Sequence, residues 1–248
     1  ITDYRSVAVD VVGWLCKYAN DNNVKSFVVG VSGGIDSAVS STLAAKTGLP
    51  VYAVGMPLNQ KVEQETLSDA HLFWLESLYP NVKKLKADLS ETYAKLMSDL
   101  TKEFTLEYTG NPMAKANTKS RLRMVTLYHV AANVGGIVVG TGNKVEDYGV
   151  GFYTKYGDGG VDIAPIADLY KTEVWELGEY LEVDQRIVDA QPTDGLWDDS
   201  RTDESQLGAS YSELEEAMET GTGPGVAVLE KFNTQNKHKM EPIPTFKL

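Results

Sequence analysis

The hydrophobic positions of the chain form two alternating kinds of segment. Short runs typical of strands lie at 27–32, 51–57 and 136–143, and residues 82–88 alternate apolar and polar as a half-buried strand does. Longer segments with apolar residues near helical spacing lie at 36–48, 63–79 and 118–135. This alternation predicts an α/β fold: a doubly wound, Rossmann-like parallel sheet with helices on both faces.

Ligands of such sheets bind beyond the carboxyl ends of the strands. Three of the predicted strands end in turns of unusual composition, namely SGGIDS at 32–37, MPLNQ at 56–60 and GTGNKVED at 140–147. We therefore expect these turns to converge on one crevice.

We find no linker that would divide the chain, so we predict a single domain over residues 1–248. Residues 194–208 are polar and acidic without periodicity, which predicts a mobile lid loop. The segment 231–248 is basic and then Pro-rich, and we expect it to pack as an extended tail over the domain. The N-terminal segment 1–18 indicates an amphipathic helix rather than a signal peptide.

Composition narrows the class of protein. The 248 residues are 42% hydrophobic and 23% charged, as in ordinary globular proteins, and no apolar run approaches the ~18 residues of a membrane span. The net charge of −12 argues against non-specific binding of nucleic acid. The single cysteine, Cys16, excludes an internal disulfide and favours a cytoplasmic location.

The motif SGGIDS carries the clearest chemistry. It lies between a predicted strand and a helix, where Gly33 and Gly34 let successive backbone N–H groups point at an anion. Asp36 beside such a phosphate site implies a bridging cation, Mg²⁺. The alternative is a Gly-rich turn in which Asp36 is simply a charge at the helix start. The loop lacks the lysine of a Walker A motif.

The run GVSGGIDS resembles the pyrophosphate-binding loop of the N-type ATP pyrophosphatases. Three further blocks, NTKSRLRM at 117–124, the long block at 140–174 that contains FYTKYGDGGVD, and the block at 192–215, are similar to signature blocks of the NAD⁺ synthetase family. The resemblance implies the adenine nucleotide alpha hydrolase-like version of the fold. It also implies the ammonia-dependent form, because the chain leaves no room for the amidase domain of glutamine-using members.

The resemblance implies a ligase that forms a C–N bond. The nicotinate carboxylate of deamido-NAD⁺ attacks ATP and releases pyrophosphate, and ammonia then attacks the adenylated carbonyl to give NAD⁺ and AMP. The resemblance also implies Mg²⁺ as cofactor, ATP as co-substrate, and a homodimer with the deamido-NAD⁺ site near the subunit interface.

The resemblance also implies site residues. It assigns to ATP binding the residues Gly30, Val31, Ser32, Gly33, Gly34, Ile35, Asp36, Ser37, Thr141, Lys171 and Thr193. It assigns to deamido-NAD⁺ the residues Arg121, Lys155, Asp162, His238 and Lys239, and to the metal Asp36 and Glu146. Asp36 and Asp203 are the catalytic candidates, with Asp203 receiving ammonium and deprotonating it.

Most of these residues also have a plainer interpretation. Glu146 and Lys171 could be surface charges, Arg121 part of a solvated helix face, and His238 an exposed tail residue. Thr193 could be a turn residue, and Asp203 could cap a helix that begins near Glu204.

The chain departs from the family pattern in three places. Gly142 and Asn143 stand where the family has an acid and a histidine, and Gly55 and Met56 offer no basic residue before the second strand-end turn. One extra residue lies between Glu146 and Lys155, and Gln60 and Lys61 could compensate for the missing base.

The sequence alone leaves two other functions to consider. Another N-type ATP pyrophosphatase could amidate or thiolate a different substrate, such as a tRNA base. A non-enzymatic module could sense adenylates, but Asp36, Glu146 and Arg121 argue against it.

Overall fold

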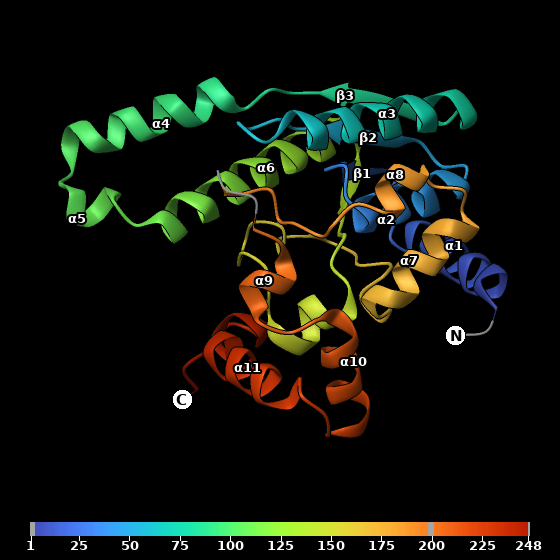
Figure 1. Ribbon diagram of the computed structural model, residues 1–248. Helices are drawn as coiled ribbons and strands as arrows, with labels where there is room; N and C mark the ends of the chain where they lie inside the picture. The colour runs from blue at the N-terminus through green and yellow to red at the C-terminus, as the bar shows by residue number, and fades with distance from the viewer. Residues whose placement is uncertain (1–2, 198–200, 248) are drawn as a thin grey trace.

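The computed structural model describes residues 3–197 and 201–247. Its centre is a parallel sheet with the order β3-β2-β1-β4 (Figure 1). The strands are β1 (Ser26–Gly30), β2 (Val51–Gly55), β3 (Val82–Lys86) and β4 (Gly136–Val139). Each coincides with a predicted strand, and the α/β class with a parallel sheet is confirmed.

The helices in the described ranges follow in chain order. They are α1 (Tyr4–Asp21), α2 (Ile35–Lys46), α3 (Val62–Leu78), α4 (Ser90–Glu103), α5 (Leu106–Thr109), α6 (Pro112–Val134), α7 (Lys171–Tyr180), α8 (Gln185–Val188), α9 (Asp203–Leu207), α10 (Tyr211–Thr220) and α11 (Val226–Met240). A single π-helical segment, η1 (Val145–Val150), lies between β4 and α7.

Two hydrophobic cores cover the two faces of the sheet. Phe27 and Val29 of β1 face a core built with α1, α2, α3 and α7, whereas Val28 between them faces a core built with α6. Because successive side chains of a strand point to opposite faces, a strand of this kind is apolar at every position. The helices on both faces confirm the doubly wound arrangement.

A third cluster lies away from the sheet. Val145 and Val150 of η1 pack with Leu207, Tyr211 and Leu214. Figure 1 shows η1, α9, α10 and α11 together below the sheet. This cluster places the segments after β4 and the segments after residue 201 against each other.

The predicted lid loop is helical in part. Residues 203–207 form α9, whose N-cap is Thr202 and not Asp203. Thr202 accepts a hydrogen bond from the Ser205 N–H, and Ser205 in turn accepts from the Thr202 N–H, which is a reciprocal capping arrangement. Part of the loop predicted at 194–208, residues 198–200, lies outside the described residues.

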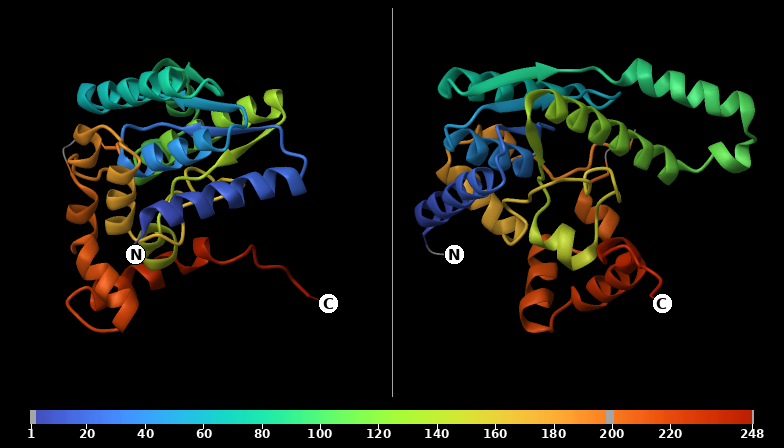
Figure 2. Two further views of the ribbon diagram at one scale, coloured as in Figure 1. Left: turned by 90° about the vertical axis from the view of Figure 1, so that its right-hand side faces the viewer. Right: turned by 180° about the vertical axis from the view of Figure 1, so that it is seen from behind.

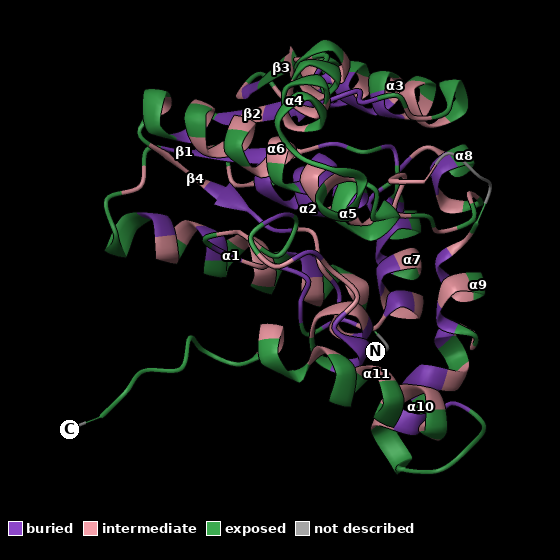
Figure 3. Ribbon diagram, turned by 90° about the vertical axis from the view of Figure 1, so that its left-hand side faces the viewer, coloured by how far each residue is buried: buried purple, intermediate pink, exposed green. Residues whose placement is uncertain are grey.

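The prediction of an extended tail over 231–248 is wrong for most of its length. Residues 226–240 form α11, because Val228, Leu229 and Phe232 pack against the third cluster, and the basic residues in its last turn suit the negative end of the helix dipole. Residues 241–247 are exposed, residues 241–243 line a cavity, and the end of the segment leads away from the body of the molecule (Figure 3).

Helix α6 begins six positions before the predicted segment, at Pro112. The Asn111 side chain accepts hydrogen bonds from the N–H groups of Met113 and Ala114, and Pro112 occupies the first turn. Helices α4, α5 and the start of α6 project from the sheet as an arm (residues 90–116), visible from the front in Figure 1 and from behind in Figure 2.

Within the described ranges, no helix combines the length and hydropathy that crossing a membrane requires.

Candidate active site

The loop between β1 and α2 has the geometry of an anion site. The N-cap of α2 is Gly34, which offers no side chain to the first N–H groups of the helix. Ser37 Oγ accepts the Ser32 N–H at 3.1 Å and donates to the Gly34 carbonyl at 3.0 Å. These bonds hold the loop in place while the helix N-terminus stays open to a ligand.

Gly33 is required by this loop. Its φ is +91°, and a Cβ at this position would lie 2.6 Å from the Gln64 carbonyl oxygen of α3. Any other residue would push the loop away from α3. The bend predicted from the two glycines is therefore tied to a specific helix contact.

Two carboxylates and one lysine meet beside this loop. The Lys171 ammonium, at the first residue of α7, donates to Asp36 Oδ2 at 2.5 Å and to Glu146 Oε1 at 3.2 Å. The Lys171 side chain is 3% exposed. Burial alone lowers the pKa of Lys171, but the charges of Asp36 and Glu146 outweigh it and raise the pKa above its ordinary value. Lys171 is thus not a surface lysine.

Asn143 organises the same cluster. Its amide nitrogen donates to Asp36 Oδ1 at 3.2 Å, and its amide oxygen accepts the N–H groups of Val145 and Glu146, each at 3.1 Å. Asn143 is fully buried. It joins Asp36 of α2 to the start of η1.

Tyr211 connects the cluster to Asp203. The Tyr211 hydroxyl lies 2.7 Å from Glu146 Oε1 and 3.3 Å from Asp203 Oδ2, so it can donate to either carboxylate. Burial, together with the charge of Glu146, raises the pKa of Asp203 to about 7. The second carboxylate oxygen of Asp203 is buried without a hydrogen-bond partner among the described residues. A carboxyl group that titrates near neutrality can exchange a proton with a ligand.

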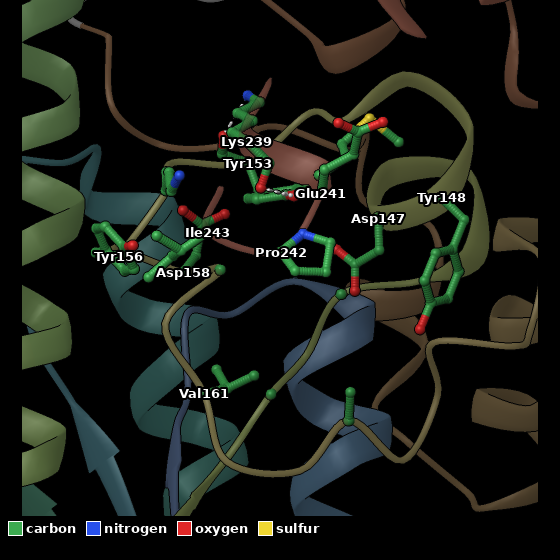
Figure 4. Close-up of a pocket in the computed structure, with 16 residues that line it drawn as sticks. Asp147, Tyr148, Tyr153, Tyr156, Asp158, Val161, Lys239, Glu241, Pro242 and Ile243 are labelled. Carbon is green, nitrogen blue, oxygen red and sulfur yellow. Dashed lines mark hydrogen bonds between the residues drawn. The ribbon is translucent and has the colours of Figure 1, made fainter. Parts of the chain in front are cut away.

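A cavity of about 310 Å³ adjoins this cluster (Figure 4). Lys155, Lys239, Tyr153, Asp147 and Asp158 are among the residues that line it. The Lys239 ammonium donates to the Tyr153 carbonyl at 2.5 Å, which fixes α11 against the wall of the cavity. Two of the residues predicted to bind deamido-NAD⁺, Lys155 and Lys239, therefore share one cavity.

The other predicted nucleotide-binding residues occupy different positions. Exposed Arg121 donates from Nε to the Lys155 carbonyl at 3.2 Å, which brings it to the rim of this region. Asp162 accepts the Tyr128 hydroxyl at 3.0 Å and the Val138 N–H at 2.8 Å, so its carboxylate is engaged within the fold. His238 is exposed on α11 and does not line the cavity.

The remaining ATP candidates lie in turns. Thr141 is half-buried directly after Gly140, which lines the cavity. Exposed Thr193 accepts the Gly195 N–H at 3.3 Å and donates to the Arg201 carbonyl at 3.3 Å. Val31 and Ile35 belong to the core under the loop, and Gly30 ends β1.

Sequence reasoning missed several members of the site. Tyr211 lies far from Asp36 in the chain, and no spacing signals their meeting. The turn at 140–147 was expected near Asp36, but its residues Asn143 and Asp147 were not named as members of the site. Half-buried Arg123 of α6 donates to the Met56 carbonyl at 3.2 Å and to Gln60 Oε1 at 2.9 Å. It thereby brings a base to the turn after β2, next to Gln60, which was considered from the sequence for that position.

No group of three or more His, Cys, Asp or Glu side chains in the described ranges is arranged to hold a metal ion by itself. Asp36 and Glu146 nevertheless approach the same nitrogen atom, so one cation can face both carboxylates. Two carboxylates are the protein share expected for Mg²⁺ that is also held by phosphate oxygens.

The profile of the family described as NAD synthase matches residues 7–241. The chain belongs to the NAD synthase family. The prediction of an enzyme of this family, made from the sequence blocks, is confirmed, because the match spans nearly the whole chain and not the SGGIDS loop alone.

Several members are similar over most of their length. The NH₃-dependent NAD⁺ synthetase of Carboxydothermus hydrogenoformans is 38% identical, with 92% of each chain covered. The protein of the same name from Methanosarcina mazei is 40% identical, with 89% of this chain and 90% of that protein covered. Among solved structures, an NMN synthetase from Francisella tularensis matches with a TM-score of 0.88 at 33% identity, covering 100% of both chains.

Proposed function

We propose that this chain is a ligase that adenylates the nicotinate carboxylate of deamido-NAD⁺ with ATP, releases pyrophosphate, and amidates the product with ammonia to give NAD⁺ and AMP. The observation that carries the proposal is the convergence of Asp36, in the first turn of α2, and Glu146, in η1, on one point beside the open N-terminus of α2. The names of the curated relatives, NH₃-dependent NAD⁺ synthetases, agree with this reaction.

Mg²⁺ fits the carboxylate pair. We infer that Asp36 and Glu146 would hold it, because both face Lys171 Nζ and Asn143 orients Asp36. When bound, the ion would neutralise phosphate oxygens of ATP. Backbone N–H groups of residues 33–37 would bind the pyrophosphate portion, and Lys171, released in part from its carboxylates, would face the same anion.

The second half of the reaction needs a proton acceptor near the adenylated carbonyl. Asp203 is suited to take the proton of ammonium because its pKa is about 7 and its Oδ1 has no internal partner in the described part of the chain. The Tyr211 hydroxyl between Glu146 and Asp203 would hold α9 against the site. We also propose that the segment around 194–208 closes over the substrates.

Lys155 and Lys239 in the cavity, with Arg121 at its rim, would bind the nucleotide that carries the nicotinate. Their positive charges counter the net charge of −12 where an anionic substrate must approach. We also propose the binding roles that the family resemblance implies for four further residues, namely Asp162, His238, Thr141 and Thr193.

A second candidate function has one observation in its favour. The Francisella tularensis NMN synthetase superposes with a TM-score of 0.88, whereas the NAD⁺ synthetase of Burkholderia pseudomallei gives 0.75 at 26% identity. The substrate could then be nicotinate mononucleotide, which undergoes the same amidation of the same carboxylate. The cavity of about 310 Å³ lies at the small end of the range for ligand sites.

We further propose a homodimer that uses the arm (residues 90–116), and a cytoplasmic location. None of the residues of α4 and α5 is buried. The arm exposes Phe104, Leu106, Tyr108 and Met113, which are 52%, 81%, 72% and 54% exposed. A protruding apolar surface of this kind is typical of an interface. The cytoplasmic location is supported by the unpaired Cys16.

An assay of the purified protein tests the function directly. ATP, Mg²⁺ and ammonium are supplied with either deamido-NAD⁺ or nicotinate mononucleotide, and AMP, pyrophosphate and the amide product are measured. We expect AMP and the amide in equal amounts. Formation of ADP and phosphate would exclude the proposed chemistry, and the ratio of kcat/KM for the two nucleotides would decide between the two candidate substrates.

A further inference from the structure

The π-helix η1 spans Val145–Val150 and carries Glu146 near its start. A π turn is wider than an α turn because it holds one residue more, and such turns occur frequently at functional sites. The Gly151 N–H donates to the Glu146 carbonyl, which closes this wide turn directly over Glu146.

The wide turn presents Asp147 to the cavity. Figure 4 shows the Asp147 carboxylate directed into the cavity beside Pro242. The carboxylate fills the space of a side chain at position 142, since a Cβ on Gly142 would overlap both carboxylate oxygens of Asp147. Glycine at position 142 therefore makes room for the carboxylate of residue 147.

The Asp147 carboxylate has no partner inside the described ranges of the fold. The charges that face it are those of Glu146, Asp158 and Asp36, all of its own sign. The two cations of the cavity are occupied, with Lys239 donating to the Tyr153 carbonyl and Lys155 lying over the Tyr156 ring. A half-buried carboxylate without donors is unfavourable. Hydroxyl groups of a ligand would satisfy it without adding charge.

The cavity indicates which ligand supplies those hydroxyls. It holds about 310 Å³ and is lined by three tyrosines and two lysines, which suits a nucleotide and is far too large for an ammonium ion. The proposed function assigns the nicotinate nucleotide to this cavity through Lys155 and Lys239, and Asp147 lines the same cavity. The sugar placed nearest to Asp147 is then the ribose joined to the nicotinate. We propose that Asp147 selects the substrate by accepting hydrogen bonds from the ribose hydroxyls of the nicotinate nucleotide.

This inference rests on the proposed function for the identity of the substrate, and its test separates the two. The kcat/KM of the wild-type protein is compared for the ribonucleotide and for analogues that lack the 2′- or the 3′-hydroxyl of the nicotinate ribose. We expect the wild type to prefer the ribonucleotide by about tenfold or more, since hydrogen bonds to charged groups are strong. In Asp147→Ala the KM for the ribonucleotide rises by a similar factor and the preference falls to about one.

Two further variants guard against a general loss of folding. Asp147→Asn keeps the shape and one acceptor, so we expect an intermediate preference. Gly142→Ala leaves residue 147 unchanged but displaces its carboxylate, and should reproduce the loss of preference, with no additional loss when it is combined with Asp147→Ala. Glu179→Gln on the exposed face of α7 is the matched acidic control and should behave as wild type.

The outcomes are separable. If no variant and no wild type forms AMP and amide from either nucleotide, the proposed function fails. If the wild type forms product but Asp147→Ala keeps its preference for the ribonucleotide, Asp147 does not accept hydrogen bonds from the ribose hydroxyls. A rise in the KM for ammonium, with the nucleotide KM unchanged, would also overturn the inference.

Discussion

The Lys171 ammonium lies 2.5 Å from the Asp36 carboxylate, although 135 positions separate the two residues in the chain. Lys171 also contacts Glu146, so one buried cation neutralises two carboxylates that come from different strand ends. Without a metal this lysine provides the main compensation for their charge. The arrangement allows a divalent ion and phosphate to take over the same neutralising role.

We predict that Lys171→Met destabilises the protein by about 3–5 kcal/mol in the absence of Mg²⁺, because it leaves two buried carboxylates uncompensated. Added Mg²⁺ should raise the melting temperature of this variant by more than it raises that of the wild type, which thermal unfolding measures. The matched control is Lys144→Met, since Lys144 pairs with the 93%-exposed Asp168 and should cost less than about 1 kcal/mol. An equal response to Mg²⁺ in all three proteins would contradict the shared site.

We predict that Asp36→Asn abolishes pyrophosphate release while the fold stays intact. The amide keeps the size of the side chain but removes half of the negative charge that would hold Mg²⁺, and a loss of at least about 100-fold in kcat is expected. Pyrophosphate release and circular dichroism measure the two parts of the prediction. Normal turnover by this variant would remove Asp36 from the metal role.

A third prediction concerns Asp203 and the use of ammonia. The carboxylate form accepts a proton, and with a pKa of about 7 it is populated above neutral pH. Asp203→Asn should therefore lower kcat/KM for ammonium by about 100-fold or more, within the range for general-base catalysis. ATP–pyrophosphate exchange in the absence of ammonium should stay near the wild-type rate. A parallel fall of exchange would assign Asp203 to adenylation or to structure.

The fold was accessible from sequence because its signals are local. The apolar runs at 27–32 and 51–57 and the helical spacing after them place β1, β2, α2 and α3 within a few residues. The start of α6 also has a local signal in Asn111 and Pro112, although the apolar spacing alone did not show it. The tail prediction failed because composition cannot distinguish a basic helix end from an extended segment.

The site was only partly accessible for the opposite reason. Asp36, Glu146 and Lys171 were recognised from motifs, and the structure brings all three together. Tyr211 was not recognised, because its role depends on α10 packing against η1, which no residue spacing reveals. Asp147 was not recognised either, because the π turn that aims it at the cavity has no signal in the residue spacing.

The arm gives a fourth prediction. Leu106 is 81% exposed at the turn of the arm, so Leu106→Asp should leave the fold of the monomer unchanged. If the arm forms the dimer interface, a buried unpaired carboxylate would shift the protein toward monomer at micromolar concentration, as measured by light scattering. Val62→Asp, which is 75% exposed on α3 outside the arm, serves as the control and should not alter the dimer. A wild-type monomer, or a dimer insensitive to Leu106→Asp, would exclude this interface.

The last prediction concerns pH and a buried histidine remote from the carboxylate cluster. His71 of α3 lies with Nε2 3.0 Å from Ser41 Oγ and stacks on Trp74, and its Nδ1 has no hydrogen-bond partner among the described residues. Burial lowers the pKa of His71 to about 4. The unfolded chain, with an imidazole pKa of about 6.5, therefore binds the proton first as the pH falls. Stability is lost between about pH 6.5 and 4, and at pH 5 this residue should lower the free energy of unfolding by about 2 kcal/mol.

Urea unfolding of the wild type and of His71→Leu at pH 7.5 and 5 measures this loss of stability, which should be absent from the variant. His129→Gln replaces an exposed histidine of α6 and should keep the wild-type dependence. If His71→Leu loses as much stability on acidification as the wild type does, the buried neutral imidazole is not the cause.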